Sequence, residues 1–289
     1  MWPRKIMDDR LRSHLRALIS ERHPVSSPVG LRRAQDYIAE EYRRLGLKVS
    51  LHAFRALGGT YKNVVGTLPP ARSALRRSKP PLIIAAHYDT VQDTPGADDN
   101  ASGLAAMLEI AGTLHKASLS SEVRFIATCL EEHDLLGSVA YAASLREANE
   151  EILGAVVLEC VGYTSDREGS QTAPPATPIA VPRVGDFLGI VANTASAPLA
   201  KDFEQAAKRE VTDLKTVSLV VPAQGEQLPD TRRSDHAAFW QFGYPALMLT
   251  DTANFRNPHY HRSTDTLETL DISFIRRVVQ AVSAMATSL

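Results

Sequence analysis

Short, continuously apolar runs dominate the hydrophobic pattern of the chain. Such runs suit strands that are buried on both faces of a sheet, whereas half-buried strands alternate between apolar and polar residues. Each run is bounded by polar residues or by turn-forming Gly and Pro. The predicted buried strands are residues 82–86, 123–130, 155–158 and 246–249.

An alternating pattern precedes these runs and predicts a half-buried strand near residue 50. Its inner face is expected to carry Leu47, Val49, Leu51 and Ala53. Residues 63–68 and 216–221 are further strand candidates. The segment 69–81 is rich in Pro and Arg, which predicts an exposed loop between strands.

Helical periodicity separates the strands, with apolar residues at three- and four-residue spacing. Gly46 predicts a helix C-terminus and Asp271 a helix N-cap. Strands that alternate with helices favour a mainly parallel sheet. We therefore expect a single α/β domain over residues 1–289, with a central mixed, mostly parallel β-sheet covered by helices on both faces. The predicted helices are residues 8–20, 30–45, 102–116, 137–145, 199–211 and 237–242, and a last one that begins at 271.

Composition narrows the class of protein without changing the predicted fold. The chain has 289 residues, 44% of them hydrophobic, and a net charge of −1, which gives no indication of a nucleic-acid partner. No apolar run approaches the ~20 residues that span a bilayer, so no membrane association is expected. The first residues lack the apolar segment of a secretory signal, and two cysteines are too few for a disulfide scaffold. We expect a cytoplasmic protein.

Metal-binding side chains stand where the predicted buried strands end. Ligands of open α/β sheets bind beyond the carboxyl ends of the strands. Two histidines and four carboxylates would gather at one edge, and such charge is costly to bury unless a cation offsets it. In chain order, the side chains that follow the four buried runs are His87 and Asp89, Glu131 and Glu132, Glu159, and Tyr260 with His261.

Taken one at a time, these motifs leave alternatives open. His87 and Asp89 are two apart, so they suit a metal-bound imidazole with a carboxylate behind it, or a loop His with an exposed Asp. The triplet 98–100, Asp-Asp-Asn, either caps the helix that follows or supplies a carboxylate that bridges two cations. Glu131 and Glu132 are adjacent and diverge in extended chain, so one could bind metal while the other reaches the attacking water.

The assembled motifs resemble the M28 family of zinc aminopeptidases, which are co-catalytic di-zinc exopeptidases. The resemblance covers roughly residues 31–270, and the combination is specific although no single motif is. It implies a zinc-exopeptidase (phosphorylase/hydrolase-like) fold. The motifs are, in order, A-H-Y-D-T, G-A-D-D-N-A-S-G, E-E-H-D-L-L-G-S, L-E-C-V-G-Y and R-N-P-H-Y-H-R-S-T-D-T.

The resemblance also implies a role for each site residue. Asp99 matches the carboxylate that bridges two Zn²⁺ ions; Co²⁺ or Mn²⁺ are possible substitutes. Glu131 matches the general base, Asp89 the partner of the His87 imidazole, and Asp235 a further supporting carboxylate. Tyr260 stands where some members place a phenol that stabilises an oxyanion. The implied ligands are His87 and Glu159 for one ion, Glu132 and His261 for the other, and Asp99 for both.

The expected reaction is removal of N-terminal residues from a peptide with a free N-terminus. Two alternatives differ from it: a mono-zinc transferase related to glutaminyl cyclase, and a non-catalytic domain with a peptidase fold. Many M28 members have Asp where this chain has Glu159, which leaves the coordination geometry open. Other nearby histidines compete for ligand roles, namely His133, His236 and His259. Cys129 and Cys160 are interpreted as small buried residues of core strands.

Overall fold

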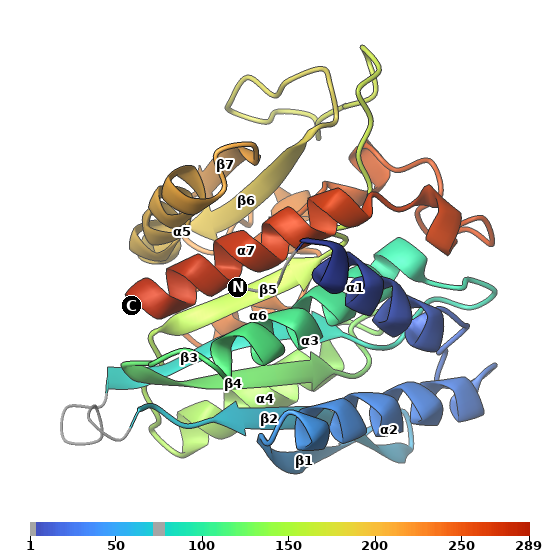
Figure 1. The fold of residues 1–289 in the computed structure, drawn as a ribbon, viewed down its shortest axis with the longest axis vertical. Helices are drawn as coiled ribbons and strands as arrows, with labels where there is room; N and C mark the ends of the chain where they lie inside the picture. The colour runs from blue at the N-terminus through green and yellow to red at the C-terminus, as the bar shows by residue number, and fades with distance from the viewer. Residues whose placement is uncertain (1–3, 72–78) are drawn as a thin grey trace.

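The computed structural model describes residues 4–71 and 79–289 and contains one eight-stranded sheet (Figure 1). The strand order is β1-β2-β4-β3-β5-β8-β6-β7. The strands are β1 (Lys48–Ala56), β2 (Gly59–Leu68), β3 (Lys79–His87), β4 (Ser121–Thr128), β5 (Gly154–Glu159), β6 (Phe187–Asn193), β7 (Lys215–Val221) and β8 (Ala246–Thr250).

The centre of the sheet is parallel, and this places four strand ends at one edge. β3 pairs in parallel with β4 and β5, and β5 pairs in parallel with β8. β6 and β7 also run parallel to each other, whereas β1, β2 and β4 pair antiparallel, as do β6 and β8. The prediction of a mixed, mostly parallel sheet is confirmed.

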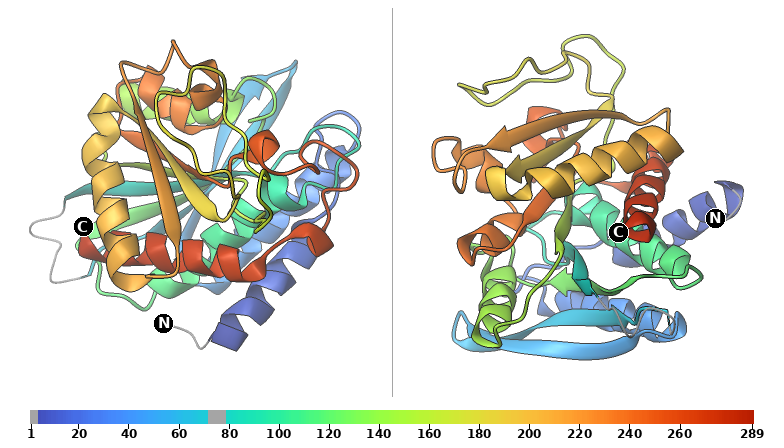
Figure 2. Two further views of the ribbon diagram at one scale, coloured as in Figure 1. Left: turned by 90° about the horizontal axis from the view of Figure 1, so that it is seen from above. Right: turned by 90° about the vertical axis from the view of Figure 1, so that its left-hand side faces the viewer.

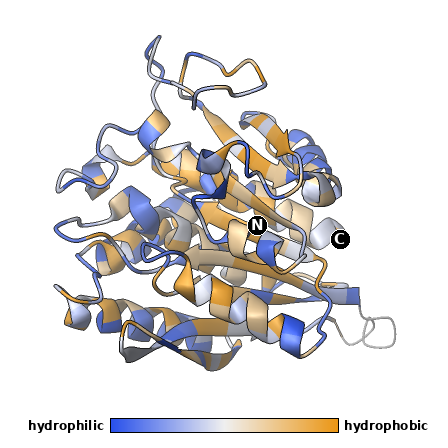
Figure 3. Ribbon diagram, turned by 180° about the vertical axis from the view of Figure 1, so that it is seen from behind, coloured by the Kyte–Doolittle hydropathy of each residue, from blue (hydrophilic) through white to orange (hydrophobic). Residues whose placement is uncertain are grey.

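Helices cover both faces of the sheet, with more of them on one face (Figures 1 and 2). α4 and α6 pack on one face, and the other helices on the opposite face. Figure 3 shows hydrophobic residues concentrated in the central strands and polar residues on the outer sides of the helices. The α-helices are α1 (Arg4–Leu18), α2 (Pro28–Arg44), α3 (Gly103–Leu114), α4 (Leu136–Glu147), α5 (Ala197–Glu210), α6 (His236–Gln241) and α7 (Ile272–Ser288).

The predicted helix ends have the expected local chemistry. Asp271 caps α7: its carboxylate accepts the N–H groups of Ser273 and Phe274 at 2.8 and 3.1 Å. Gly46 follows α2 with a φ of 77°, in the left-handed region that favours glycine after a helix. All seven predicted helices are found within a few residues of their expected bounds.

One strand was missing from the sequence-based prediction. β6 is apolar, but Gly189 interrupts it, and glycine weakens a strand pattern. β6 also follows directly on the Pro-rich segment 164–185, which has neither helix nor strand, so the sequence did not set the strand apart from this irregular segment. β6 pairs β7 on one side and β8 on the other, and it therefore extends the sheet beyond the site.

The inner face predicted for β1 was wrong in part. Val49 is half-buried as expected, but Leu51 is 42% exposed and Ala53 is exposed as well. Phe54 and Ala56 are the partly buried residues instead. β1 is an edge strand, where alternation reports burial poorly because the sheet continues on one side only.

The predicted loop 69–81 lies partly outside the described residues. Residues 69–71 have no regular structure, β3 begins at Lys79, and residues 72–78 lie in the gap. Among the described helices, none combines the length and the apolar character that crossing a membrane requires.

Candidate metal centre

Segments that are distant in sequence bring the predicted ligands together at the carboxyl edge of the sheet. His87 is the last residue of β3 and Glu159 the last residue of β5. Glu131 and Glu132 follow β4 by three and four residues, and His261 lies in the loop between β8 and α7. Because β3, β4, β5 and β8 are parallel, their ends point to one place.

Asp99 lies between two imidazoles. Its Oδ1 is 3.1 Å from Nε2 of His87, and its Oδ2 is 2.9 Å from Nε2 of His261. Both carboxylate oxygens are therefore used, each toward a different histidine. A carboxylate in this position could hold one ion with each oxygen, as a bridging ligand of a two-metal site does.

Each imidazole has a further carboxylate beside it. Oε2 of Glu159 is 3.4 Å from Nε2 of His87, and Oε2 of Glu131 is 3.9 Å from the same atom. Oε1 of Glu132 is 3.4 Å from Nε2 of His261. The cluster thus has two halves that share Asp99, and ligand atoms of several of its members lie within 4.8 Å of one another.

The orphaned atoms of this cluster fit metal ions. Nε2 of His87, Oδ1 of Asp99 and Oε1 of Glu132 are buried and have no hydrogen-bond partner among the described residues. Buried polar atoms normally have partners, and unsatisfied ones call for an explanation. Imidazole nitrogen and carboxylate oxygen are ligands that Zn²⁺ accepts, so the donor set suits the ion that the sequence implied.

The hydrogen bond made by Nδ1 of His87 leaves Nε2 as the nitrogen that can bind a metal ion. Nδ1 is 3.2 Å from the main-chain carbonyl oxygen of Asp89, which can only accept, so Nδ1 donates. The carboxylate of Asp89 is 3.7 Å away and instead accepts the N–H groups of Glu131 and Glu132 at 3.1 and 3.2 Å. Asp89 therefore orients His87 through its carbonyl and the two glutamates through its side chain.

The Asp-Asp-Asn triplet divides its roles among three residues. Asn100 performs the capping role, since its Oδ1 accepts the N–H of Gly103 at 3.1 Å. Asp98 accepts the N–H of Gly162 at 2.8 Å and the side-chain amide of Asn257 at 2.7 Å. Asp99, the middle residue, is left to face the imidazoles. The Asp99–Asn100 peptide bond is cis.

Crowded carboxylates perturb one another's protonation. Burial and the nearby Asp99 raise the pKa of Glu132 to about 7. Burial also raises the pKa of Glu131 well above its usual range, and the charges of Glu159, Glu132 and Asp235 act in the same direction, against His87. Burial is the main cause of both shifts and the neighbouring carboxylates add to it, and bound cations would relieve both by favouring the charged carboxylates.

Several supporting residues were not singled out from the sequence. Ser234 donates to Oε2 of Glu159 at 2.7 Å, and Asp265 accepts the N–H groups of Asp98 and Asp99 at 2.9 and 3.2 Å. Ser234 directly precedes Asp235, and Asp265 lies four residues after His261, so position near a residue that the sequence indicated was the available signal. Asp235, which the sequence did indicate, is buried and accepts a hydrogen bond from the Thr128 hydroxyl.

Tyr260 lies over His261. The two rings stack with centroids 3.8 Å apart and planes 15° apart. The Tyr260 hydroxyl accepts a hydrogen bond from Nη2 of Arg233 at 3.2 Å, so the phenol proton remains available to another acceptor. Burial, together with Asp99 and other acidic groups, raises the pKa of this phenol, which keeps it protonated at neutral pH.

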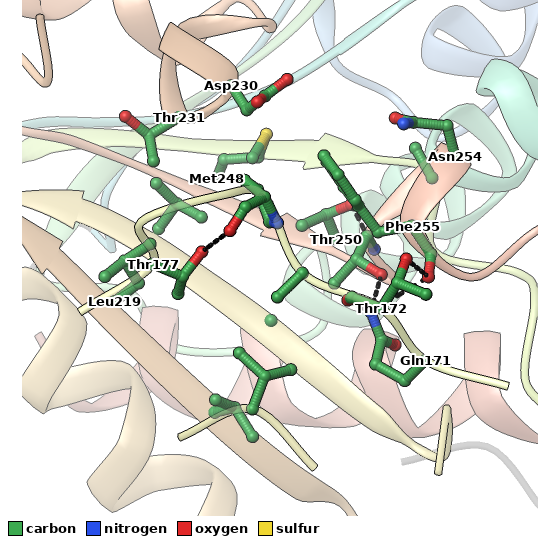
Figure 4. A pocket seen from close by; sticks show the side chains of 18 of the residues that line it. Gln171, Thr172, Thr177, Leu219, Asp230, Thr231, Met248, Thr250, Asn254 and Phe255 are labelled. Carbon is green, nitrogen blue, oxygen red and sulfur yellow. Dashed lines mark hydrogen bonds between the residues drawn. The ribbon is translucent and has the colours of Figure 1, made fainter. Parts of the chain in front are cut away.

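An apolar cavity of about 120 Å³, which opens to solvent, adjoins Glu159 and Tyr260 (Figure 4). Its floor is formed by side chains of the neighbouring strands, among them Val191, Leu219 and Met248. The Pro-rich segment 164–185 and the loop 222–234, both expected near the site, contribute walls to it. The cavity is large enough for a bulky side chain, and its lining is mainly hydrophobic.

The comparison with known proteins agrees with this geometry. The model of Peptidase family M28 matches residues 63–286, which is most of the chain and includes every predicted ligand. The chain belongs to peptidase family M28. The expectation of a hydrolytic enzyme of this family, with its α/β fold, is confirmed.

Similar proteins include both characterised and uncharacterised M28-like chains. YfbL of Escherichia coli, described as uncharacterized, is 34% identical over 296 residues, covering 97% of this chain and 88% of that one. A zinc aminopeptidase from Bacillus subtilis has a TM-score of 0.59 and 26% identity, covering 79% of this chain and 50% of that one. Tannerella forsythia glutaminyl cyclase has a TM-score of 0.69 and 17% identity, with 98% of both chains covered, which shows a shared fold.

The competing histidines of this M28 member have other partners. His259 Nδ1 is 2.9 Å from the Thr264 hydroxyl, and the ring of His133 lies 5.4 Å from that of His23. His236 is fully buried, and its Nε2 lies 2.8 Å from the carbonyl of Thr231. None of the three belongs to the groups of metal-binding atoms found in the described part of the chain. Cys129 and Cys160 are buried and free, as interpreted from the sequence, but each lies one residue beyond the end of its strand, and Cys160 Sγ donates to Oε1 of Glu159 at 3.2 Å.

His236 is expected to make stability sensitive to acid. Burial lowers its pKa from 6.5 to about 4, so the folded state resists a proton that the unfolded state accepts. Its contribution is present above about pH 6.5 and is lost as the pH falls toward 4. The free energy of unfolding of the metal-free chain, measured in urea, should fall between pH 7.5 and 4.5. The fall should be about 2–3 kcal/mol smaller in His236→Gln than in the parent protein. The exposed His115→Gln serves as the control, and equal losses in parent and His236→Gln would contradict this role.

Proposed function

We propose that this chain is a zinc-dependent exopeptidase that removes N-terminal residues from peptides. One observation carries the proposal: Asp99 presents one oxygen to His87 and the other to His261. The Bacillus subtilis zinc aminopeptidase, 26% identical over the shared region, supports both the metal and the reaction.

The proposed ligands follow the two halves of the cluster. His87 and Glu159 would hold one Zn²⁺, His261 and Glu132 would hold the other, and Asp99 would be shared between them. Zn²⁺ ions in such a site polarise the scissile carbonyl and lower the pKa of water, and Co²⁺ or Mn²⁺ could replace them. Two such ions would offset the three carboxylates of the set, which accounts for the burial of so much negative charge.

Glu131 is the proposed general base. Its carboxylate is buried on the His87 side of the cluster, near Glu159, where an attacking water would lie. Burial raises the pKa of this carboxylate above its usual range, which makes it a stronger base toward the attacking water than a solvated glutamate. Asp89 fixes the main chain of Glu131 through the N–H hydrogen bond. Tyr260 is proposed to donate its free proton to the oxygen of the substrate carbonyl.

The apolar cavity is the proposed site for the side chain of the terminal residue. It begins at Glu159 and Tyr260, so a peptide whose terminal carbonyl lies at the metal cluster directs its first side chain into it. The lining from Val191, Leu219 and Met248 favours aliphatic or aromatic side chains, because burial of apolar surface stabilises binding. A substrate with a bulky apolar N-terminal residue fits this arrangement.

Metal content and a substrate panel test the proposed function. We expect about two zinc ions per chain, cleavage of leucyl- and phenylalanyl-nitroanilides, and loss of activity with a chelator that returns when zinc is added. One ion per chain with cyclisation of N-terminal glutamine would instead favour a transferase like the structurally similar glutaminyl cyclase. Zinc-free protein with no hydrolysis would favour a non-catalytic domain.

Glu131→Gln tests the general base. The substitution keeps the size of the side chain but removes the proton acceptor, so kcat should fall by about 10²–10⁴-fold while the zinc content stays at the parent value. Both are measured on the same preparation, by steady-state hydrolysis and metal analysis. The exposed Glu151→Gln is the matched control and should match the parent. A Glu131→Gln enzyme with parental kcat would refute this role.

Leu219→Trp tests the substrate pocket. The larger side chain fills part of the cavity, so kcat/KM for leucyl and phenylalanyl substrates should fall by about tenfold or more relative to the alanyl substrate. Val220, the next residue on β7, is 45% exposed and points away from the cavity, so Val220→Trp is the control. An unchanged preference in Leu219→Trp would place the terminal side chain elsewhere.

A further inference from the structure

Arg22 is a fully buried arginine that the mechanism above does not use. It lies in the short connection after α1, and its side chain has no exposed surface. α1 packs against α3, beside the turn that carries Asp99 (Figure 1). Arginine is almost never fully buried without partners, so the position requires an explanation. Arg22 also precedes residues 63–286, the part of the chain that matches the family model.

The guanidinium of Arg22 ties the turn of the site to the N-terminal segment. Nε donates to the carbonyl of Tyr88 at 2.8 Å, Nη1 to that of Pro95 at 3.0 Å, and Nη2 to that of Gly96 at 3.0 Å. Nη1 also donates to the carbonyls that end α1. The main-chain N–H of Arg22 donates to the hydroxyl of Thr90 at 2.9 Å.

These contacts fall on the segment that joins the two central ligands. Residues 88–96 connect His87, at the end of β3, to Asp99 in the following turn. Tyr88 is next to His87, and Gly96 is three residues before Asp99. By holding both ends of this segment, one side chain fixes how far apart and in which direction the two ligands stand.

Gly96 accommodates this contact. A Cβ atom at this position would lie 2.7 Å from Nη2 of Arg22 and 2.5 Å from the carbonyl oxygen of Asp99. Its φ of 64° is also in the region that favours glycine. The Gly96 carbonyl accepts the N–H of Ala101 at 3.1 Å as well, so the arginine and the Asp99 turn share one acceptor.

Arg22 also supplies a fixed positive charge beneath the carboxylates. Burial lowers its pKa to about 10, while Asp99, Asp89, Asp265 and Glu132 favour the charged form. The group is therefore protonated at neutral pH. Lysine would keep the charge, but its three ammonium donors lack the planar fork that reaches carbonyls on two segments at once.

We propose that Arg22 is a positioning residue of the metal centre, which holds the 88–96 segment so that His87 and Asp99 face a common ion. The metal part of this inference rests on the proposed function; the ordering of the segment does not. It follows that the N-terminal segment completes the site from outside the region matched by the family model.

Two measurements on the intact chain test the proposal, in Arg22→Met and Arg22→Lys. The first is zinc affinity by competition with a chromophoric chelator. The second is amide hydrogen exchange of residues 97–101 in the metal-free protein, where several N–H groups are hydrogen-bonded. We expect the zinc dissociation constant to rise at least tenfold in Arg22→Met and by less in Arg22→Lys. Exchange of residues 97–101 should be faster in both.

Arg124→Met is the matched control. Arg124 is a largely buried, ion-paired arginine of β4, bonded to Glu122 and Glu150 away from the strand ends. Its loss should lower the melting temperature but leave zinc affinity and exchange of 97–101 unchanged. Arg22 variants with zinc affinity within twofold of the parent and parental exchange would overturn the proposal, as would equal effects in Arg124→Met.

Two further outcomes have defined meanings. If Arg22→Met does not fold, both measurements are made on Arg22→Lys alone, because this substitution keeps the charge and most of the volume of the side chain. If the parent protein binds no zinc, the proposed function fails, and exchange in the metal-free variants alone decides whether Arg22 orders the segment.

Discussion

Repulsion between buried carboxylates is the constraint on which this structure depends. Asp99, Glu131, Glu132 and Glu159 meet at the ends of the central strands, and the two histidines beside them do not offset their charge. A fold that only had to be stable would separate such groups, because burying charge is costly without compensation. The arrangement is consistent with a chain selected to hold cations, and the free electron pairs of His87 and Asp99 point to the same conclusion.

The sheet topology brings the charges together, and hydrogen bonds to the main chain hold them there. Parallel pairing of β3, β4, β5 and β8 delivers side chains from four segments to one edge. Two proposed ligands and the proposed base are fixed through their own backbone: Asp89 holds the N–H groups of Glu131 and Glu132, and Asp265 holds that of Asp99. These supporting carboxylates add negative charge, which increases the need for cations instead of relieving it.

Much of the fold and site could be predicted because the signal was local. The buried strands were continuous apolar runs, and His87 and Glu159 stand directly at their ends. The rest depended on contacts between distant segments. β6 became a strand by pairing between β7 and β8, and Leu51 is exposed because β1 lies at an edge. No local sequence pattern indicates the role of Arg22, because its hydrogen-bond partners Tyr88 and Gly96 are distant in the sequence.

The separation of metal centre and pocket explains how one fold can serve different reactions. The predicted ligands stand at or just beyond strand ends, whereas the walls of the cavity come largely from the irregular segments 164–185 and 222–234. Loops accept changes in length and sequence more readily than buried strands do. A glutaminyl cyclase can therefore share this fold with peptidases, and fold similarity alone does not decide the reaction. In this chain His261 and Glu132 meet at the second carboxylate oxygen of Asp99, and the proposed two-ion site depends on this half of the cluster.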